Sequence, residues 1–515
     1  MSETPAPRGV LRPPPVVAGV AFAKLAILLT CATAYGYDKD ELYSLACAQH
    51  FAWGFVERPP LSIGVLLTAA KIYGETLLSV RMLPAVSGAV VIVMTARLAR
   101  RFGAGTLGQG LAALSVLVAP ALLTLDHTFS MRGFEVLWWT LIAGMLARTL
   151  TTPQETFLRA WVAAGLVIGL GIMNTWTTLV LVVGLALGFV VTPARAQLKT
   201  RGPWIALGVA AVCMAPNLAW ERAHAWTSIH YASHALHEAA LTASPLRFTL
   251  TQLVKMQPTN SIVWIAGLVG LFRLKSLAPY RLFGVAFLFA FAVFAVRAPG
   301  DSTCLAPAYP VLFAAGAATL DGWLTARRHA YAVLALALFV PGAVTVPFAI
   351  PILSVAKFEA YSRALHVTPK LADNADRPPL PEHFADMFGW PELVRTTSTV
   401  TASLSALDRD EAVVLANGTA RAAAMDVFGD AVALPPVISG QGTYWLWGPG
   451  AASGNVVVAV GGDEAFLRAH FRTVALVTVF GHSLASPSER HVRIYLCRDP
   501  VAPLAEMWPD FRTLD

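Results

Sequence analysis

The sequence predicts an α-helical polytopic membrane protein with a C-terminal extracytoplasmic α/β domain, and three observations lead to this fold class. The 515-residue chain is 56% hydrophobic and only 13% charged, whereas soluble domains contain about 25% charged residues. Apolar runs long enough to cross a bilayer recur through the first 355 residues. Beyond them the pattern changes to short valine-rich runs separated by turn residues, which is typical of a soluble domain.

We predict about eleven membrane spans in the N-terminal part, each near the 20 residues that a bilayer requires. The runs lie near 16–34, 79–98, 104–123, 133–151, 157–173, 175–192, 204–220, 260–273, 281–297, 304–324 and 330–354. The first run ends without a small-residue cleavage motif, so we interpret it as a retained helix and not as a signal peptide.

Basic residues mark one side of the predicted membrane. They cluster in alternate short loops, as at Arg97, Arg100 and Arg101, and the positive-inside rule places these loops and the N-terminus in the cytoplasm. The corner 126–135, the loop 221–260 and the C-terminal part then lie outside it. The net charge of +7 does not indicate nucleic-acid binding, because the basic residues stand in short groups between apolar runs.

We expect a membrane domain over residues 1–355, a polar, Pro-rich linker over 356–385 and an extracytoplasmic α/β domain over 386–515. In the last of these, "EAVVLAN", "NVVVAVGG" and "HVRIYLC" are predicted strands, and "DEAFLRAHFRTV" has helical spacing.

Much charge stands in the stretch 35–61, directly after the first apolar run. Asp40 and Glu41 are expected in the first turn of an amphipathic helix whose apolar face lies in the lipid, where carboxylates suit a helix N-terminus. That interpretation does not explain Glu57, the residue that precedes Arg58 and a rigid Pro-Pro pair. Carboxylates at a membrane surface suit transfer of a group from a lipid-linked donor, because one can accept the proton of the acceptor while cations hold the departing phosphate.

Five segments together resemble a known family. They are "DKDELYSLACAQHFAWGFVERPPL", "LDHTFSMRGFEVLWWTL", "APNLAWERAHAW", "CLAPAYPVLFAAGA" and "LPPVISGQGTYWLWGPG". They are similar to bacterial glycosyltransferase family 39, membrane glycosyltransferases of the GT-C type related to protein O-mannosyltransferases and to the lipid A aminoarabinose transferase. The resemblance implies a sugar donor linked to polyprenyl phosphate and an envelope acceptor, which is a lipid, glycan or protein. It also implies direct displacement on the outer face of the bacterial inner membrane.

The resemblance also implies site residues. Asp40, with Glu41 beside it, matches the family's catalytic acidic position. Glu57 matches an acidic position that helps to position substrate or a metal, and Glu135 is similar to a second acidic position that the family keeps near the site; both are predicted to bind substrate. Helix capping, or an ion pair with a neighbouring arginine, is the alternative for each of these carboxylates. The other predicted substrate-binding residues are Arg58, Arg132, Asp126, His127 and Tyr309.

Two departures from the family pattern concern the donor phosphate. Relatives often carry a lysine near 175 and another just before "LAPAYP", where this chain has Asn174-Thr175-Trp176 and "GDSTC". Arg58, Arg132 or Arg297 is expected to replace them, because a guanidinium binds phosphate with several donors. A repurposed, non-catalytic member is one alternative. A transporter or flippase is another, although the charges gather at the outer ends of the predicted spans.

Neither metal binding nor the aromatic loop is settled by the sequence. His230, His234 and His237 share a helical face, but they lack the HExxH order, so a divalent metal is possible without a predicted ligand set. The loop "GTYWLWGPG" at 442–450 either stacks on a sugar of the acceptor or docks the outer domain on the membrane part.

Overall fold

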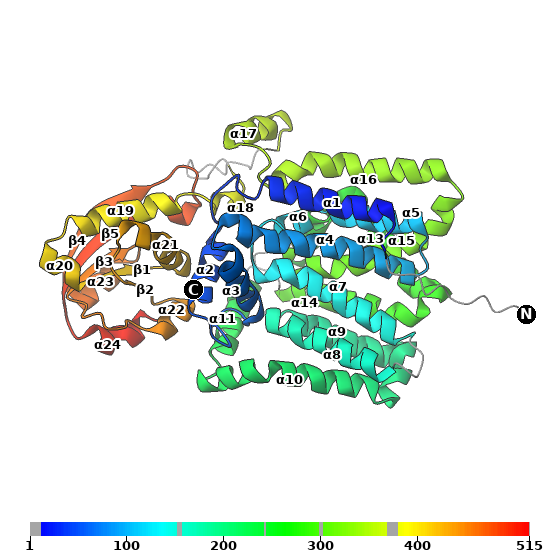
Figure 1. The fold of residues 1–515 in the computed structure, drawn as a ribbon, viewed down its shortest axis with the longest axis horizontal. Helices are drawn as coiled ribbons and strands as arrows, with labels where there is room; N and C mark the ends of the chain where they lie inside the picture. The colour runs from blue at the N-terminus through cyan, green and yellow to red at the C-terminus, as the bar shows by residue number, and fades with distance from the viewer. Residues whose placement is uncertain (1–11, 152–156, 242–243, 298–301, 368–379, 514–515) are drawn as a thin grey trace, which may run out of the picture.

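The computed structural model describes residues 12–151, 157–241, 244–297, 302–367 and 380–513. Figure 1 shows a bundle of long helices that run side by side and adjoin a smaller α/β part, with α2, α3 and α11 between the two. The predicted combination of a helical membrane part and a C-terminal α/β part is therefore confirmed.

All regular secondary structure in the described N-terminal part is helical. The α-helices are α1 (Pro15–Thr30), α2 (Lys39–Gln49), α3 (Leu61–Tyr73), α4 (Leu77–Arg101), α5 (Thr106–Leu117), α6 (Pro120–Leu125), α7 (Met131–Thr149), α8 (Phe157–Asn174), α9 (Thr178–Val191), α10 (Gly202–Ala223), α11 (Thr227–Leu241), α12 (Pro245–Lys255), α13 (Ser261–Arg273), α14 (Arg281–Arg297), α15 (Tyr309–Thr325), α16 (Arg328–Ala349) and α17 (Val355–Ala364). Short 3-10 helices η2 (Pro193–Lys199), η3 (Pro258–Asn260), η4 (Lys275–Tyr280) and η5 (Ser302–Ala308) adjoin them.

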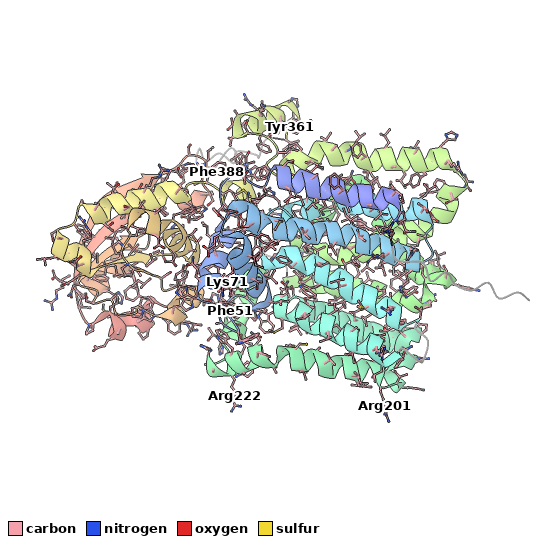
Figure 2. All side chains as sticks on the ribbon, in the orientation of Figure 1. Phe51, Lys71, Arg201, Arg222, Tyr361 and Phe388 are labelled. Atoms are coloured by element: carbon pink, nitrogen blue, oxygen red, sulfur yellow. The ribbon has the colours of Figure 1, made fainter. Side chains whose placement is uncertain are left out.

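Six helical segments among the described residues are long and apolar enough to cross a membrane, or up to eight if each of two bent pairs is one span. The predicted number of eleven is therefore not confirmed. The helices α1, α7 and α13 also run within the bundle (Figure 1). Of these, α1 is apolar but only 16 residues long, and α7 carries three charged residues, Arg132, Glu135 and Arg148. Figure 2 marks the two ends of α10 by Arg201 and Arg222, the latter on the side of the α/β part.

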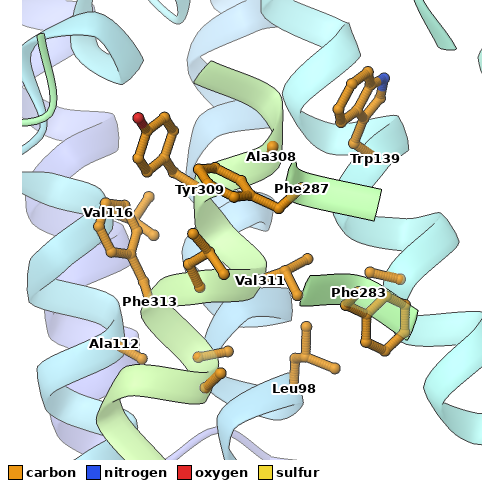
Figure 3. Packing of buried hydrophobic residues seen from close by; sticks show 14 of the residues in the cluster. Leu98, Ala112, Val116, Trp139, Phe283, Phe287, Ala308, Tyr309, Val311 and Phe313 are labelled. Atoms are coloured by element: carbon orange, nitrogen blue, oxygen red, sulfur yellow. The ribbon is translucent and has the colours of Figure 1, made fainter. Parts of the chain in front are cut away.

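The interior of the bundle is one continuous apolar cluster. Figure 3 shows part of it, in which Tyr309, Val311 and Phe313 of α15 lie near Phe287 of α14. Helices approach most closely where glycine replaces a side chain: a Cβ built at Gly316 would lie 1.9 Å from the carbonyl oxygen of Val263 on α13. Small residues at such contacts are how membrane helices gain close packing without a hydrophobic driving force.

The α/β part contains a five-stranded mixed sheet in the order β2-β1-β3-β5-β4. Its elements are α18 (Glu382–Ala385), α19 (Trp390–Ala402), α20 (Ala406–Glu411), β1 (Ala412–Ala416), α21 (Thr419–Gly429), η6 (Asp430–Val432), β2 (Val437–Ile438), α22 (Gly442–Trp447), β3 (Val456–Val460), α23 (Glu464–His470), β4 (Phe471–Gly481), η7 (Pro487–Glu489), β5 (His491–Pro500), α24 (Leu504–Met507) and η8 (Trp508–Phe511). Strands β1, β2 and β3 are parallel, whereas β5 pairs antiparallel with β3 and β4. The division at residues 355 and 385 stays a prediction, and 368–379 of the expected linker lies outside the described residues.

The two parts share a second apolar cluster that includes residues of α2, α3, α21 and the sheet. Leu42 and Leu45 of α2 are fully buried in it, and α2 contacts both α3 and α21. The expectation that the apolar face of this helix lies in lipid is therefore wrong. The α/β part covers that face, which no pattern within the helix itself could indicate.

Candidate active site

The start of α2 is fixed by a capping box. The Asp38 side chain accepts a hydrogen bond from the backbone N–H of Asp40 at 2.9 Å, and Glu41 Oε2 accepts one from the backbone N–H of Asp38 at 2.9 Å. Such reciprocal bonds satisfy amide groups that a helix N-terminus leaves without partners. They place Asp40 in the first turn, as the sequence predicts, with its side chain exposed.

Glu41 points the other way, into the protein, and is fully buried. Arg81 of α4 donates from Nε to Oε1 and from Nη2 to Oε2, both at 2.9 Å. The backbone N–H of Phe129 also donates to Oε1 at 2.9 Å. The same guanidinium binds the carbonyl oxygens of Ala32 and Gly36. Glu41 and Arg81 therefore fasten the end of the first loop, the start of α2 and the corner after α6 to one another.

Arg58 lies against α2 and is also buried. Its Nη1 donates to Ser44 Oγ at 2.9 Å, and its guanidinium carbon lies 4.7 Å from the centre of the Tyr43 ring. Ser44 Oγ in turn donates to the Asp40 carbonyl oxygen at 2.6 Å. Burial opposes the charge of Arg58, but nearby groups, with Asp40 the strongest, leave its pKa raised above the usual value. Its Nε is buried with no hydrogen-bond partner among the described residues.

Glu57 connects this loop to the α/β part. Its Oε2 accepts a hydrogen bond from the Tyr43 hydroxyl at 2.5 Å and another from Thr443 Oγ1 of α22 at 3.0 Å. Thr443 also donates its backbone N–H to the Tyr43 hydroxyl and accepts from the backbone N–H of Val56. Burial, followed by the charge of Glu57, raises the pKa of Tyr43 well above its usual value, so Tyr43 remains a neutral donor. The aromatic loop thus docks the α/β part on the membrane part, one of its two predicted roles.

Tyr231 of α11 is a further member of this cluster. Burial, and then the charges of Glu57 and Asp40, raise its pKa, while Arg58 lowers it. Ser228, one turn earlier on α11, donates from Oγ to the Phe55 carbonyl oxygen at 2.9 Å and so fixes the helix to the loop. The site therefore combines side chains of α2, the loop before α3, α11 and α22.

The remaining predicted residues lie outside this cluster. Glu135 of α7 is buried and accepts a hydrogen bond from Thr177 Oγ1, and Arg132 lies one turn before it. Asp126 forms a buried ion pair with Lys24 of α1, with Oδ2 2.5 Å from Nζ. Its neighbour His127 is buried beside Cys31. Glu135 and Arg132 thus belong to α7, and Asp126 and His127 directly follow α6, whereas Asp40 is on α2.

Tyr309, the first residue of α15, is fully buried. Its hydroxyl donates to Gln252 Oε1 of α12 at 3.2 Å, and its ring packs edge-on against Trp264 and Phe287 (Figure 3). Arg297, the last residue of α14, is exposed.

The positions of the two missing lysines differ in their surroundings. Near 175, Asn174 donates to the Met131 carbonyl oxygen, and Thr175 shares a hydrogen bond with the same Thr177 that contacts Glu135. In the second segment, Thr303 and Cys304 are buried in η5, whereas Asp301 lies outside the described residues.

The expected histidine face forms on α11, but only His230 and His234 have described side chains, and that of His237 lies outside them. Within the described part of the chain no group of three or more His, Cys, Asp or Glu side chains could hold a metal ion.

Sequence reasoning missed Arg81, Tyr43, Ser44, Thr443 and Tyr231. Arg81 carried a usable signal, because an ionisable residue within an otherwise apolar run indicates a buried partner. Thr443 and Tyr231 carried none, since their role depends on contacts between segments far apart in the chain.

Comparisons with known proteins agree with this architecture. Residues 57–220 match the family model described as dolichyl-phosphate-mannose-protein mannosyltransferase. The structure of ArnT from Cupriavidus metallidurans bound to undecaprenyl phosphate is 14% identical with a TM-score of 0.57, and the match covers 93% of this chain and 97% of that one. The apo structure of the same protein is 13% identical with a TM-score of 0.59, at the same coverage.

Archaeal oligosaccharyltransferase AglB from Archaeoglobus fulgidus, in complex with an inhibitory peptide and a dolichol-phosphate, also matches. It is 12% identical with a TM-score of 0.46, over 64% of this chain and 55% of that one. A comparison with curated protein sequences finds no significant match. The ArnT likeness confirms the predicted GT-C fold, in the membrane part and the α/β part alike.

Proposed function

We propose that the protein is a membrane glycosyltransferase that moves a sugar from a polyprenyl-phosphate carrier to an envelope acceptor. The observation that carries the proposal is the exposed carboxylate of Asp40 beside the buried cation of Arg58, at the end of the bundle that the α/β part covers. The ArnT structure with bound undecaprenyl phosphate and the mannosyltransferase family match support this class of donor.

The proposed reaction is a direct displacement in which Asp40 is the general base. The acceptor hydroxyl or amine attacks the anomeric carbon of the sugar, and its proton passes to the Asp40 carboxylate. The bond from the anomeric carbon to the phosphate oxygen breaks, and polyprenyl phosphate leaves with the electron pair. A positioned base of this kind accelerates such a step by about 10² to 10⁴.

Arg58 is proposed to hold the phosphate as its charge grows. Contacts with Ser44 and the Tyr43 ring restrain its guanidinium before substrate binds, and Nε is a buried donor that is not used within the described chain. A restrained cation of this kind pays little entropy on binding, and its planar fork can replace a lysine as a phosphate ligand. Glu57 is proposed to position the Arg58 guanidinium through Tyr43. It is also proposed to contact the substrate, as the sequence predicts.

The other predicted residues receive roles according to their surroundings. Glu41, whose two oxygens bind Arg81, is proposed to position Asp40 and not to accept the proton itself. Glu135 and Arg132, at the start of α7, are proposed to bind the donor from the bundle side. Asp126, His127 and Tyr309 are proposed to stabilise the packing of the bundle next to the donor-binding residues Glu135 and Arg132.

We place the reaction on the extracytoplasmic face of a bacterial inner membrane. On α4, Arg81 lies beside the site and Arg101 lies 20 residues further on, which is about 30 Å along a helix and close to the thickness of the hydrocarbon core. Arg97, Arg100 and Arg101 gather at that far end. The positive-inside rule makes it the cytoplasmic one and puts the site outside.

A transporter of lipid-linked sugars is the second candidate. One observation favours it: Lys24 and Asp126 form a fully buried ion pair within the bundle, and such intramembrane charges often mark transport pathways. A non-catalytic member of the family, the third alternative, is favoured only by the missing lysines.

The deciding experiment measures transfer of label from a panel of radiolabelled polyprenyl-phosphate sugars to membrane acceptors. Asp40→Asn should lower transfer about 100-fold or more while the protein remains monodisperse. Glu75→Gln, which neutralises another exposed carboxylate at the same end of the bundle, should leave it unchanged. Equal loss in both variants refutes Asp40 as the base. No transfer from any donor in the wild type refutes the glycosyltransferase. Loss of transfer on adding a chelator would establish the metal that the sequence leaves possible.

A further inference from the structure

The helix α22, which docks the α/β part through Thr443, also borders a cavity. Tyr444 and Trp447 of this helix line it, together with residues of β1, β2 and α21 and with His50 at the end of α2. Its volume of about 540 Å³ falls within the range of about 300–1,000 Å³ that is usual for small-molecule sites. The cavity therefore lies where the two parts meet and is large enough for a ligand.

Trp447 gives this cavity an aromatic surface in a restrained position. His50 stacks on its ring, with the centroids 4.4 Å apart and the planes inclined by 29°. Tyr444 meets the same ring edge-on, with the centroids 4.5 Å apart. A side chain that its neighbours already restrain loses little conformational freedom when a ligand binds, and a flat ring suits contact with an apolar face of that ligand.

Carboxylates also line this cavity. Asp426 of α21 accepts a hydrogen bond from the Tyr444 hydroxyl through Oδ2, and its Oδ1 has no hydrogen-bond partner among the described residues. Asp410 and Glu411 line the same space, Glu411 accepting a hydrogen bond from Asn455 Nδ2 at 3.0 Å. No lysine or arginine is among the described lining residues. Because an ionised carboxylate only accepts hydrogen bonds, the cavity suits a ligand that donates them and disfavours phosphate and other anions.

A sugar ring satisfies both requirements. A pyranose has an apolar face of C–H groups, which can lie on an aromatic ring, and a rim of hydroxyl groups that can donate hydrogen bonds to carboxylates. A peptide strand would instead need backbone partners at the edge of the sheet. The edge strand at this cavity, β2, has only two residues, Val437 and Ile438, and so short an edge gives a peptide little to pair with.

We propose that this cavity binds a neutral sugar ring of the acceptor, with the apolar face of the sugar against Trp447 and its hydroxyl groups donating to Asp426. This inference rests on the proposed function and assigns the acceptor to the glycans. His50 follows Asp40 by ten residues on α2, which is about 15 Å along the helix. A single sugar ring does not span that distance, so the acceptor is an oligosaccharide that occupies the cavity with one unit and presents another to Asp40.

Saturation-transfer difference NMR of the purified full chain tests this proposal without requiring sugar transfer. The protein is kept in lauryldimethylamine oxide, because maltoside and glucoside detergents are themselves sugars. The probes are neutral disaccharides of glucose, galactose, mannose and N-acetylglucosamine, an anionic disaccharide of galacturonic acid, and a tetralysine peptide. At least one neutral disaccharide should bind, about ten-fold or more tightly than the anionic disaccharide and the peptide, as hydrogen bonds to a charged group predict.

Three variants locate the binding. Trp447→Ala removes the aromatic surface, and Asp426→Asn removes the charge of the acceptor group while keeping its shape, so each should weaken binding of that disaccharide about ten-fold. Asp426→Asn can still accept the Tyr444 hydroxyl and should remain monodisperse even if Trp447→Ala does not. The control is Trp53→Ala, which removes a tryptophan that is 54% exposed in the loop before α3 and should leave binding unchanged.

The outcome for this cavity is separable from that for the proposed function. Asp40→Asn should bind the disaccharide as the wild type does, because Asp40 is about 15 Å away along α2. Sugar binding without transfer from any donor would support the cavity and refute only the glycosyltransferase. Sugar transfer without binding of any neutral disaccharide would leave the glycosyltransferase standing and overturn the sugar site.

Two other results would also overturn the proposal. Tetralysine that binds as tightly as the neutral disaccharides, and loses affinity in Asp426→Asn, would assign the cavity to a cationic peptide. Equal weakening of disaccharide binding by Trp447→Ala and Trp53→Ala would reduce the effect to general contact of sugars with exposed aromatic side chains.

Discussion

Replacement of Glu41 by alanine should destabilise the protein strongly, whereas replacement of its exposed neighbour Asp40 should have little effect on stability. The Glu41 carboxylate accepts four hydrogen bonds at 2.9 Å, two from Arg81 and one each from the amides of Asp38 and Phe129. The exposed fractions of the Glu41 and Arg81 side chains are 0% and 1%. The substitution leaves a buried guanidinium with only backbone carbonyl partners, and removing one member of a buried ion pair costs about 3–5 kcal/mol.

The assay is thermal unfolding of the detergent-solubilised protein, followed by loss of the monodisperse peak in size-exclusion chromatography. At about 2 °C per kcal/mol, the lower end for domains of 150–250 residues, Glu41→Ala should lower the melting temperature by about 6 to 10 °C. Asp40→Asn, one position earlier and exposed, should lower it by less than about 1 °C. If Glu41→Ala melts with the wild type, the carboxylate does not fasten α2 to α4, and its catalytic role returns to consideration.

Three further predictions concern a close helix contact, a buried ion pair and a buried histidine. Gly316→Ala should cost about 1–3 kcal/mol, since its Cβ would lie 1.9 Å from the Val263 carbonyl oxygen; an unchanged melting temperature would refute the close contact. Lys24→Met should destabilise by about 3–5 kcal/mol, and adding Asp126→Leu should restore most of that stability, because the second change removes the unpaired buried charge. Burial lowers the pKa of His383 to about 4. The contribution of the neutral His383 to the free energy of unfolding should therefore be fully present above about pH 6.5. It should be lost as the pH falls toward 4, because the unfolded chain takes up the proton and the folded chain does not. That loss should be smaller in His383→Gln, measured as melting temperature against pH.

The fold was predictable from the sequence because its strongest signals are local. Long apolar runs required membrane helices, valine-rich runs correctly indicated β1 and β3, and the alternation of "HVRIYLC" correctly indicated β5. The strand β4 was missed, and the prediction of helix over 463–474 was wrong in its last part, because α23 ends at His470 and β4 begins at Phe471. The order β2-β1-β3-β5-β4 could not be read from spacing, since it depends on which strands pair across the chain.

The prediction of the site was limited for the same reason. A charged loop after the first span was correctly identified as the place where acidic and basic residues gather, and Asp40, Glu57 and Arg58 do lie together. The sequence did not distinguish Asp40 from Glu41, because helical periodicity places neighbours about 100° apart but does not say which of them faces the protein. Only the position of Arg81 on α4 decides that question.

The contact between Glu57 and α22 has a consequence for activity. A Cβ built at Gly442, whose φ is +54°, would lie 1.7 Å from Glu57 Oε1. Gly442→Ala must therefore displace the carboxylate or move α22 away, and either change weakens the hydrogen bond between Glu57 and Thr443. Glu57 also accepts a hydrogen bond from the Tyr43 hydroxyl, and Arg58 lies over the Tyr43 ring. The disturbance therefore reaches Arg58, the proposed ligand of the phosphate.

Gly442→Ala should therefore lower the rate of sugar transfer with little effect on the melting temperature of the bundle, while Gly448→Ala is the matched control. Gly448 also has a positive φ, +80°, at the other end of α22, but a Cβ there meets no atom within 4 Å. Gly448, at φ +80° and ψ −178°, lies in a region open essentially only to glycine, so Gly448→Ala imposes backbone strain of about 1–3 kcal/mol without a steric contact. A loss of transfer confined to Gly442→Ala therefore isolates the contact with Glu57. Equal rates in the two variants would mean that the α/β part merely sits on the membrane part; a selective loss in Gly442→Ala would mean that it completes the active site.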